Sequence, residues 1–301
     1  MKKTHPVAPT VLSYAAVTAK RPAASLPPPR VSIVTVARNA AATLGRTIQA
    51  VQDQRMPSIE HVVVDGASTD GTQDLLRQRL RPQDFWLSEP DRGIADAFNK
   101  GVALARGTYI QFLNADDWLS DGQVAHAVAV LERTGADFVF GDLVFHRDGQ
   151  PAFHYRGDPG YAAGLHSHLP PVNHPTILAR RTLFKRSGLF CLEHGYAMEY
   201  DWLQRVQRCG GLGVHDAGIV GHMTHEGVSN IAFRRTAREV RDIAIAYGQN
   251  PLKAHIRAEL NIAKTALSHH VRARSPRLYE TLRGRINRAY VPVDSAGGPA
   301  R

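Results

Sequence analysis

Apolar residues along the chain fall into short runs separated by stretches of helical spacing. Residues 31–36 are rich in β-branched side chains and form the first run, and Leu44, Ile48 and Val51 follow it on one face of an expected helix. The same alternation continues over about 110 residues, which predicts an α/β fold with a doubly wound, mostly parallel sheet. Further strands are expected at residues 61–64, 85–87, 109–113 and 137–140.

A turn signal interrupts this alternation in the later part of the chain. Asp148 and Gly149 stand between two apolar runs, and such a pair is typical of a tight hairpin turn. A hairpin joins antiparallel neighbours, whereas the earlier strands are joined through helices. The sheet is therefore expected to be mixed.

The two ends of the chain differ in composition from its middle. Residues 1–30 are rich in Pro, Ala and Ser and are expected to form a disordered leader. Residues 231–301 carry 14 Lys and Arg against 5 Asp and Glu, net +9, whereas residues 1–230 carry 23 against 22. We therefore expect a nearly neutral working domain at residues 31–230, followed by a basic helical extension at residues 231–301 that seeks an anionic surface.

The composition also limits the class of protein. The two cysteines, Cys191 and Cys209, lack metal-ligand spacing, so neither a disulfide framework nor a zinc site is indicated. Residues 4–19 contain two prolines and a histidine and make a poor secretory segment, and no apolar run approaches the length of a membrane span. These features favour a soluble globular protein and permit a reducing cytoplasm.

Polar residues end the apolar run at residues 109–113. Asn114, Asp116 and Asp117 follow it closely. In open α/β sheets ligands bind beyond the carboxyl ends of the strands, so these side chains are expected where a divalent cation and a diphosphate could meet. The alternative is an acidic pair that only forms a turn and caps a helix.

Four motifs follow one another in register: VSIVTVARN, VVVDGASTDGT, SEPDRGIADAFNKG and FLNADDW. In order and spacing they resemble bacterial family 2 glycosyltransferases, especially the branch that assembles exopolysaccharide and O-antigen repeats. The resemblance extends through HPTILARRTLF and YAMEYDWLQRV to about Asn230. It implies a GT-A fold, a nucleotide-sugar donor, a divalent metal (Mn²⁺ or Mg²⁺), a glycan or lipid-linked acceptor, and inversion at the anomeric carbon.

The resemblance assigns donor contacts to several strand ends. In the family the acid at the end of the second strand contacts the nucleoside, and Asp65 matches it; a carboxylate there accepts hydrogen bonds from base or ribose. Residues 91–100 match the segment that closes over the nucleotide. The alternatives are a turn or capping role for Asp65 and a solvated surface patch for the basic residues. The expected donor-binding residues are Asp65, Ser68, Asp91, Arg92, Lys100 and Asn114.

The metal motif departs from the Asp-x-Asp pattern of much of the family, because its first position is Asn114. Asn offers only a neutral oxygen, so the metal is expected to be held mainly by Asp116 and the diphosphate. GT-A enzymes often supply a late histidine to the metal, which makes His222, with His225 near it, a candidate ligand. Most such histidines are structural, and both interpretations remain open.

An acidic residue on a helix of the acceptor half is the expected general base. In the family it stands six positions before an arginine, and Glu199 keeps this spacing to Arg205, with Asp201 as the second candidate. A base must be poised to take the acceptor proton as the new bond forms. The alternative is a surface ion pair. On the family's pattern, His174 is expected to line the acceptor cleft.

Two helical stripes of apolar residues follow Asn230. Basic residues occupy the other faces, a pattern that fits peripheral contact with a membrane surface. The alternative is that both stripes pack on the working domain. The expected location is the cytoplasm, extending to the inner face of the plasma membrane. The first stripe is Val240, Ile243, Ala244 and Tyr247, and the second is Ile256, Leu260, Ala263, Leu267 and Val271.

Other functions remain as alternatives. A nucleotidyltransferase could share the α/β sheet, but a Gly-rich, basic phosphate loop is expected after its first strand, where this chain has ARNAAAT. A protein that binds a nucleotide-sugar without turning it over is also compatible with the motifs. A nucleic-acid partner is least favoured, because the chain lacks an aromatic-interleaved basic motif and its positive charge lies outside the motif-bearing domain.

Overall fold

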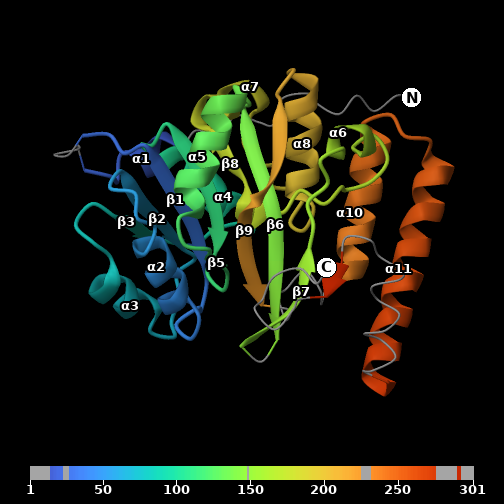
Figure 1. Ribbon diagram of the computed structural model, residues 1–301, viewed down its shortest axis with the longest axis horizontal. Helices are drawn as coiled ribbons and strands as arrows, with labels where there is room; N and C mark the ends of the chain where they lie inside the picture. The colour runs from blue at the N-terminus through green and yellow to red at the C-terminus, as the bar shows by residue number, and fades with distance from the viewer. Residues whose placement is uncertain (1–13, 23–26, 148, 225–231, 276–289, 293–301) are drawn as a thin grey trace.

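A mixed sheet forms the centre of the molecule (Figure 1). The computed structural model describes residues 14–22, 27–147, 149–224, 232–275 and 290–292. The strands in this part of the chain are β1 (Val31–Ala37), β2 (Ile59–Asp65), β3 (Phe85–Ser88), β4 (Tyr109–Asn114), β5 (Trp118–Leu119), β6 (Phe138–Arg147), β7 (Gln150–Tyr155), β8 (Leu178–Arg180), β9 (Gly213–Thr224) and β10 (Tyr290–Pro292).

The strand order is β10-β7-β6-β8-β4-β1-β2-β3, with β9 paired to both β6 and β5. β1 is parallel to β2 and β4, β2 is parallel to β3, and β6 is parallel to β9. β8 runs antiparallel to β4 and β6, and β7 forms an antiparallel pair with β6. The expected α/β fold with a mixed sheet is confirmed. Helices α2, α3 and α4 connect the parallel strands β1, β2, β3 and β4.

Helices cover both faces of the sheet. Successive residues of a strand point to opposite faces, so Val34 and Phe112 enter one core while Ile33 and Leu113 enter the other. Helices α4, α7, α8 and α10 supply the first core, and α5 supplies much of the second. The helices are α1 (Ala15–Thr18), α2 (Leu44–Gln52), α3 (Thr72–Arg79), α4 (Ile94–Leu104), α5 (Gln123–Thr134), α6 (Tyr161–Gly164), the 3₁₀ turn η1 (His174–Thr176), α7 (Arg181–Ser187), α8 (Met198–Arg208), α10 (Phe233–Ala246) and α11 (Pro251–Arg274).

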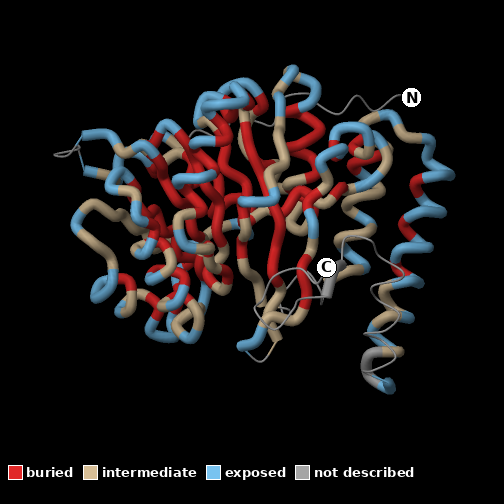
Figure 2. Tube along the Cα trace, viewed as in Figure 1, coloured by how far each residue is buried: buried red, intermediate tan, exposed pale blue. Residues whose placement is uncertain are grey.

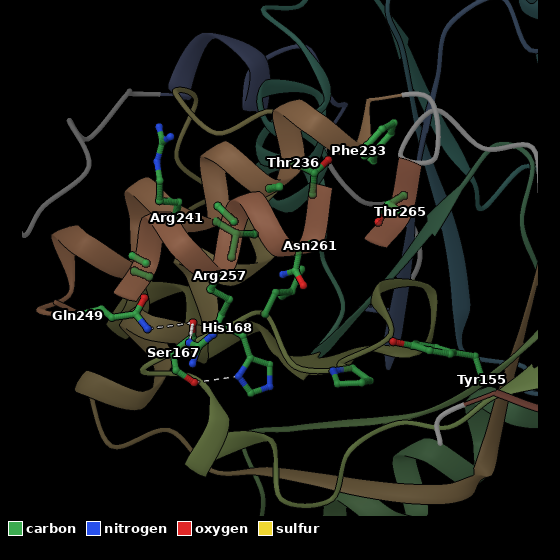
Figure 3. Close-up of a pocket in the computed structure, with 17 residues that line it drawn as sticks. Tyr155, Ser167, His168, Phe233, Thr236, Arg241, Gln249, Arg257, Asn261 and Thr265 are labelled. Atoms are coloured by element: carbon green, nitrogen blue, oxygen red, sulfur yellow. Dashed lines mark hydrogen bonds between the residues drawn. The ribbon is translucent and has the colours of Figure 1, made fainter. Parts of the chain in front are cut away.

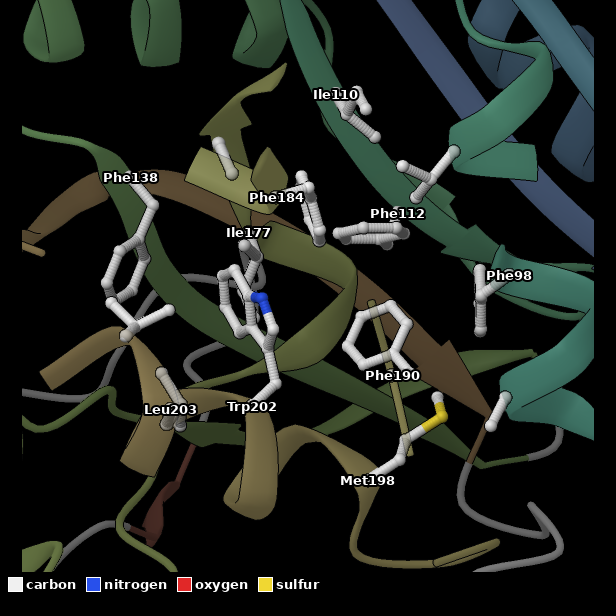
Figure 4. Packing of buried hydrophobic residues seen from close by; sticks show 14 of the residues in the cluster. Phe98, Ile110, Phe112, Phe138, Ile177, Phe184, Phe190, Met198, Trp202 and Leu203 are labelled. Carbon is white, nitrogen blue, oxygen red and sulfur yellow. The ribbon is translucent and has the colours of Figure 1, made fainter. Parts of the chain in front are cut away.

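An aromatic cluster joins α8 to β4 (Figure 4). The rings of Phe112 and Phe190 lie 5.4 Å apart, and those of Phe184 and Trp202 are stacked at 5.3 Å. The indole N–H of Trp202 donates to Ser187 Oγ at 3.0 Å, so its polar atom is satisfied although the side chain is fully buried. This packing fixes the position of α8 relative to the strand that precedes the acidic motif.

Residues 14–22, within the expected leader, contact the rest of the protein. The Tyr14 hydroxyl, directly before α1, donates to Asp96 Oδ1 on α4 at 2.6 Å. The Arg21 guanidinium pairs with the buried Glu60 carboxylate. These contacts join the described segment 14–22 to α4 and β2, and the assignment of residues 1–30 as a leader stays a prediction.

The start of the basic extension packs on the rest of the protein. Ile243 and Ala244 of α10 are each 1% exposed, and Glu239 accepts hydrogen bonds from the N–H groups of Tyr196 and Ala197 at 2.7 and 3.1 Å. In Figure 1, α11 is the outermost element and lies beside α10. Within the described part of the chain, none of the helices has the length and apolar character needed to span a bilayer. The division between residues 31–230 and 231–301 stays a prediction.

A buried histidine makes the stability of the sheet depend on pH. His61 on β2 is 1% exposed, and its Nε2 lies 2.8 Å from Thr35 Oγ1. Burial lowers the pKa of His61 from 6.5 to about 4. Between these values the unfolded chain binds the proton and the folded chain does not. This contribution to stability is therefore complete above pH 6.5 and is lost as the pH falls toward 4.

Lowering the pH from 6.5 to 4 should reduce the free energy of unfolding, with about 3 kcal/mol of the loss due to His61. Glutamine does not titrate, so the free energy of unfolding of His61→Gln should fall by about 3 kcal/mol less than that of the wild type between pH 6.5 and 4. Denaturant unfolding at a series of pH values measures the difference, and His255→Gln, at an exposed position on α11, is the control. An unchanged pH profile in His61→Gln would contradict this account.

Candidate active site

The carboxyl ends of β1, β2 and β4 meet at one edge of the sheet. Ala37 of β1 pairs with Asp65, and Val36 pairs with Asn114. One strand therefore separates Asp65 from Asn114, which corresponds to about 10 Å across the sheet. Polar side chains from two motifs that are far apart in the sequence thus face the same edge.

Asp65 lies fully buried at the end of β2 and is held by the loop that follows it. Its carboxylate accepts hydrogen bonds from the N–H of Ser68 at 3.1 Å, from the Ser68 hydroxyl, and from the Ser88 hydroxyl at 2.6 Å. The Ser68 hydroxyl in turn accepts from the N–H of Asn39, a residue with a positive φ of 51°, at 2.7 Å. Since a carboxylate has about four acceptor positions, Asp65 retains capacity for a further donor.

Asp91 reaches the same turn from the loop before α4. A Cβ atom on Gly66 would lie 2.5 Å from Asp91 Oδ2, so the absence of a side chain at position 66 leaves room for the Asp91 carboxylate in its present position. The other oxygen of Asp91 accepts from the N–H of Gly93 at 2.8 Å. Asp91 therefore contacts the residue that directly follows Asp65.

Lys100 and Arg92 hold this loop in different ways. Lys100 Nζ lies 2.8 Å from Glu89 Oε1 and donates to the Pro90 carbonyl at 2.8 Å, and its side chain is only 6% exposed. Arg92 Nη2 donates to Asp96 Oδ1 at 3.0 Å, and the Arg92 side chain remains 56% exposed. Lys100 is thus directed at the loop backbone, whereas Arg92 keeps N–H groups available at the surface.

Of the two acidic residues after β4, Asp117 is fully buried and Asp116 is half-buried. Asn114 Nδ2 donates to Asp117 Oδ2 at 2.8 Å, while Asp117 Oδ1 is buried without a hydrogen-bond partner. Burial and the neighbouring Asp116 raise the pKa of Asp117 well above its usual value, and burial also raises the pKa of Asp116. Arg46 is a nearby cation, and its Nη2 donates to the Asp116 carbonyl at 3.2 Å.

These two carboxylates fit a divalent cation with few protein ligands. A cation beside them would favour their ionised forms and provide a partner for the unsatisfied oxygen of Asp117. In the part of the chain that is described, the side chains of His, Cys, Asp and Glu form no group of three or more that could hold a metal. A cation bound here would therefore take further ligands from a diphosphate and from water, as Mg²⁺ commonly does.

His222 lies on β9, opposite Trp118 of β5. The two rings are stacked with centroids 5.2 Å apart. Its Nε2 lies 2.8 Å from Ser120 Oγ and its Nδ1 lies 3.0 Å from His146 Nε2. Burial, and then the neighbouring His146, lower the pKa of His222 to about 4, so the ring is neutral near pH 7. Binding a metal would require one of these contacts to break. His225 lies outside the described residues.

Glu199 lies in the first turn of α8 and contacts His174. Nδ1 of His174 is 3.0 Å from Glu199 Oε1, although neither ring nitrogen is aligned for a hydrogen bond. Burial raises the pKa of the Glu199 carboxyl, but the charge of His174 and the contact with it outweigh burial, and the net pKa is lowered. The His174 ring packs 5.3 Å from that of Phe112, which shares a face of β4 with Asn114.

Asp201 is engaged on both oxygens. Nε and Nη2 of Arg205 donate to its Oδ2 at 3.0 and 2.8 Å, and the Tyr247 hydroxyl donates to its Oδ1 at 3.0 Å. Asp201 and Arg205 are 7% and 9% exposed. Arg205 therefore pairs with Asp201, four positions before it, and this network ties α8 to α10.

A cavity of about 450 Å³ lies elsewhere, between α10, α11 and the segment before η1 (Figure 3). Its walls include Tyr155, His168, Phe233 and Arg257. It is lined by none of the residues predicted for donor, metal or base. The candidate site is therefore identified by its polar side chains and their partners, not by this cavity.

Sequence reasoning missed three contributors to the site. The Arg46 guanidinium lies 3.7 Å from the ring centre of Trp118, Ser88 donates to Asp65, and His146 contacts His222. These three residues belong to α2, β3 and β6, and only the tertiary pairing of distant segments brings them to the site. Asp117, in contrast, was visible as part of the acidic run.

Comparison with known proteins gives a consistent picture. Residues 32–198 match the family model described as "Glycosyl transferase family 2". Over 179 residues the chain is 30% identical to a protein of Mycobacterium tuberculosis named "PGL/p-HBAD biosynthesis glycosyltransferase", and this match covers 58% of the chain and 68% of that protein.

Two solved structures share the fold. One is S. aureus TarS 1-349 in complex with UDP-GlcNAc, with a TM-score of 0.53, 16% identity, and coverage of 80% of this chain and 72% of that one. The other is the mannosyltransferase PcManGT from Pyrobaculum calidifontis in complex with GDP-Man and Mn²⁺, with a TM-score of 0.56, 19% identity, and coverage of 88% and 82%. At these identities the likeness establishes the fold alone.

Asp201→Asn should lower stability, because the buried Arg205 guanidinium would lose its charged partner. Breaking a buried ion pair from one side costs about 3–5 kcal/mol. Denaturant unfolding measures the loss. The matched control is Asp74→Asn, which disrupts an exposed pair with Arg77 and should change stability by less than about 1 kcal/mol. Equal stability of Asp201→Asn and the wild type would show that the network contributes little.

Proposed function

Because the chain belongs to glycosyl transferase family 2, we propose that it moves a sugar from a nucleotide-sugar donor to a hydroxyl group of a glycan or lipid-linked acceptor, with inversion at the anomeric carbon. The proposed setting is bacterial polysaccharide or glycolipid biosynthesis, in line with the mycobacterial relative. The observation that carries the proposal is the Glu199 carboxylate, whose pKa is lowered beside His174 and which lies near the strand ends that bear the acidic motif.

We assign donor binding to the loops after β2 and β3. Asp65 and Asp91 accept hydrogen bonds from the base or the ribose hydroxyl groups of the nucleotide. Ser68 orients Asp65 through its two hydrogen bonds to that carboxylate. Arg92, with N–H groups at the surface, contacts a phosphate, and Lys100 holds the loop in place from below.

Asp116, with Asp117 next to it, would hold a divalent cation, Mn²⁺ or Mg²⁺. Such a cation, when bound, stabilises the negative charge of the leaving nucleoside diphosphate. The raised pKa values of both carboxyl groups and the unsatisfied Asp117 oxygen support this assignment, as does the Mn²⁺ complex of the structural neighbour. Asn114 orients Asp117 through its amide group, and His222 supports β5 through Ser120.

Glu199 is the proposed general base. Its lowered pKa keeps the carboxylate ionised at neutral pH, so it can accept the proton of the acceptor hydroxyl. The hydroxyl oxygen then bonds to the anomeric carbon as the bond to the diphosphate breaks. Attack from the side opposite the leaving group inverts the configuration. His174 orients Glu199 and stabilises its charge.

A matching nucleotide-sugar, supplied with Mn²⁺ at 100 times its dissociation constant, should stabilise the protein by about 2.7 kcal/mol. Screening UDP-, GDP- and dTDP-sugars by melting temperature identifies this donor. Asp116→Asn should lose the Mn²⁺-dependent part of the stabilisation together with transfer, whereas Asp121→Asn, at an exposed position nearby, should retain both. A panel without any effect, or normal transfer by Asp116→Asn, would contradict the proposed site.

Glu199→Gln should keep its shape and donor affinity but lower turnover by roughly 10²–10⁴-fold, the usual contribution of a positioned general base. Turnover, donor affinity and melting temperature are measured on each variant. Glu193→Gln, at an exposed position before α8, is the control and should behave as the wild type. Normal turnover by Glu199→Gln would end the assignment, and donor binding without turnover in the wild type would identify a binding protein instead.

A further inference from the structure

One face of α11 carries a stripe of exposed apolar side chains. Its members recur at spacings of four and seven residues, which places them on one side of the helix. Three of them, Ile256, Leu260 and Leu267, belong to the second stripe expected from the sequence. We call these residues the α11 stripe: Leu252, Ile256, Leu260 and Leu267, which are 69%, 52%, 65% and 63% exposed.

The opposite face of α11 accounts for its packing. Ala254, Ala258 and Ile262 are 2%, 4% and 5% exposed, and α11 lies against α10. Figure 2 shows exposed segments along the outer side of α11. The α11 stripe therefore contributes nothing to the packing of the described residues. A contiguous row of large apolar side chains in water indicates a binding surface.

Positive charge accompanies the stripe. Along its length α11 has five Lys and Arg residues and one acidic residue, Glu259. Lys253 lies three residues before Ile256, and Lys264 lies between Leu260 and Leu267, so both border the stripe on the helix surface. Long basic side chains beside an apolar row can extend to phosphate groups while the row enters a less polar layer.

We propose that the α11 stripe lies in the headgroup region of an anionic lipid bilayer, with the helix axis parallel to the membrane plane. Apolar residues in one row and lysines at its border match the two layers of such a surface, the acyl boundary and the negatively charged headgroups. The proposal does not depend on the reaction assigned to the protein.

The same charges disfavour a second copy of the chain as the occupant. Pairing two α11 stripes would bring two sets of basic residues together with only Glu259 of each copy to offset them. A single row of four side chains is also small beside the roughly 1,200–2,000 Å² that stable protein interfaces bury. An anionic lipid surface attracts these basic residues instead of repelling them. It also does not require a protein interface of that size.

Vesicle binding by the full chain tests the proposal. Truncation at residue 231 is unsuitable, because it would also remove α10 and its contacts with α8. The protein is mixed with vesicles of phosphatidylcholine alone or with about one third phosphatidylglycerol, at low and at high salt, and bound protein is separated by flotation. The wild type should bind the anionic vesicles and lose binding at high salt.

Two pairs of substitutions separate the apolar and the charged contributions. The double variant Ile256→Gln, Leu260→Gln should bind anionic vesicles about tenfold more weakly, or weaker still, than the wild type. Lys253→Gln with Lys264→Gln should weaken it about 30-fold at low salt, since each basic residue near an anionic surface contributes about fivefold. The control is Leu212→Gln, which removes an apolar side chain that is 53% exposed outside α11 and should bind as the wild type does.

Three outcomes would overturn the proposal. The first is that the wild type does not bind anionic vesicles, which would mean that the stripe is covered in another way. The second is equal binding by the wild type and the Ile256→Gln, Leu260→Gln variant. The third is a dimer in sedimentation velocity that this variant dissociates, which would assign the stripe to a second copy. Melting temperatures confirm that each variant is folded.

Discussion

Parallel pairing of β1 with β2 on one side and with β4 on the other is the constraint on which the candidate site depends. The register sets Ala37 beside Asp65 and Val36 beside Asn114, so both polar residues emerge at one edge. A slip of one residue would turn every side chain of a strand to the opposite face. The fully buried Val34, which specifies the register by filling the core, therefore also specifies the geometry of the site.

Charged groups around this edge fall into two environments. Lys100 and Asp201 are buried with partners that satisfy them, and they hold the loop before α4 and helix α8 in position. Asp117 is fully buried and Asp116 is half-buried, and both have much less compensation. Burial of a carboxylate without a partner costs free energy unless it is protonated or paired. This unfavourable burial occurs at a position where a bound cation would pair with the carboxylates and lower its free energy cost.

The sequence predicted the elements well and their partners poorly. The run at residues 109–113 corresponds to β4 (Tyr109–Asn114) because a short apolar run is a local property of the chain. The spacing of Glu199 to Arg205 could not reveal that Arg205 pairs with Asp201, or that the same carboxylate accepts from Tyr247, which directly follows α10. Likewise α10 and α11 both showed an apolar stripe, and among the described residues only the stripe of α10 is covered. Amphipathicity identifies an apolar face but does not identify what packs on it.

The contact between Tyr14 and Asp96 has a consequence for the order of folding. The two residues are 82 positions apart, and Asp96 also binds Arg92 in the loop that we assign to the donor. Because synthesis proceeds from the amino terminus, Tyr14 leaves the ribosome long before its partner exists. β1 and β2 can pair while the leader is still undocked. The contact that secures this loop from the leader side can therefore form only after α4 has been made.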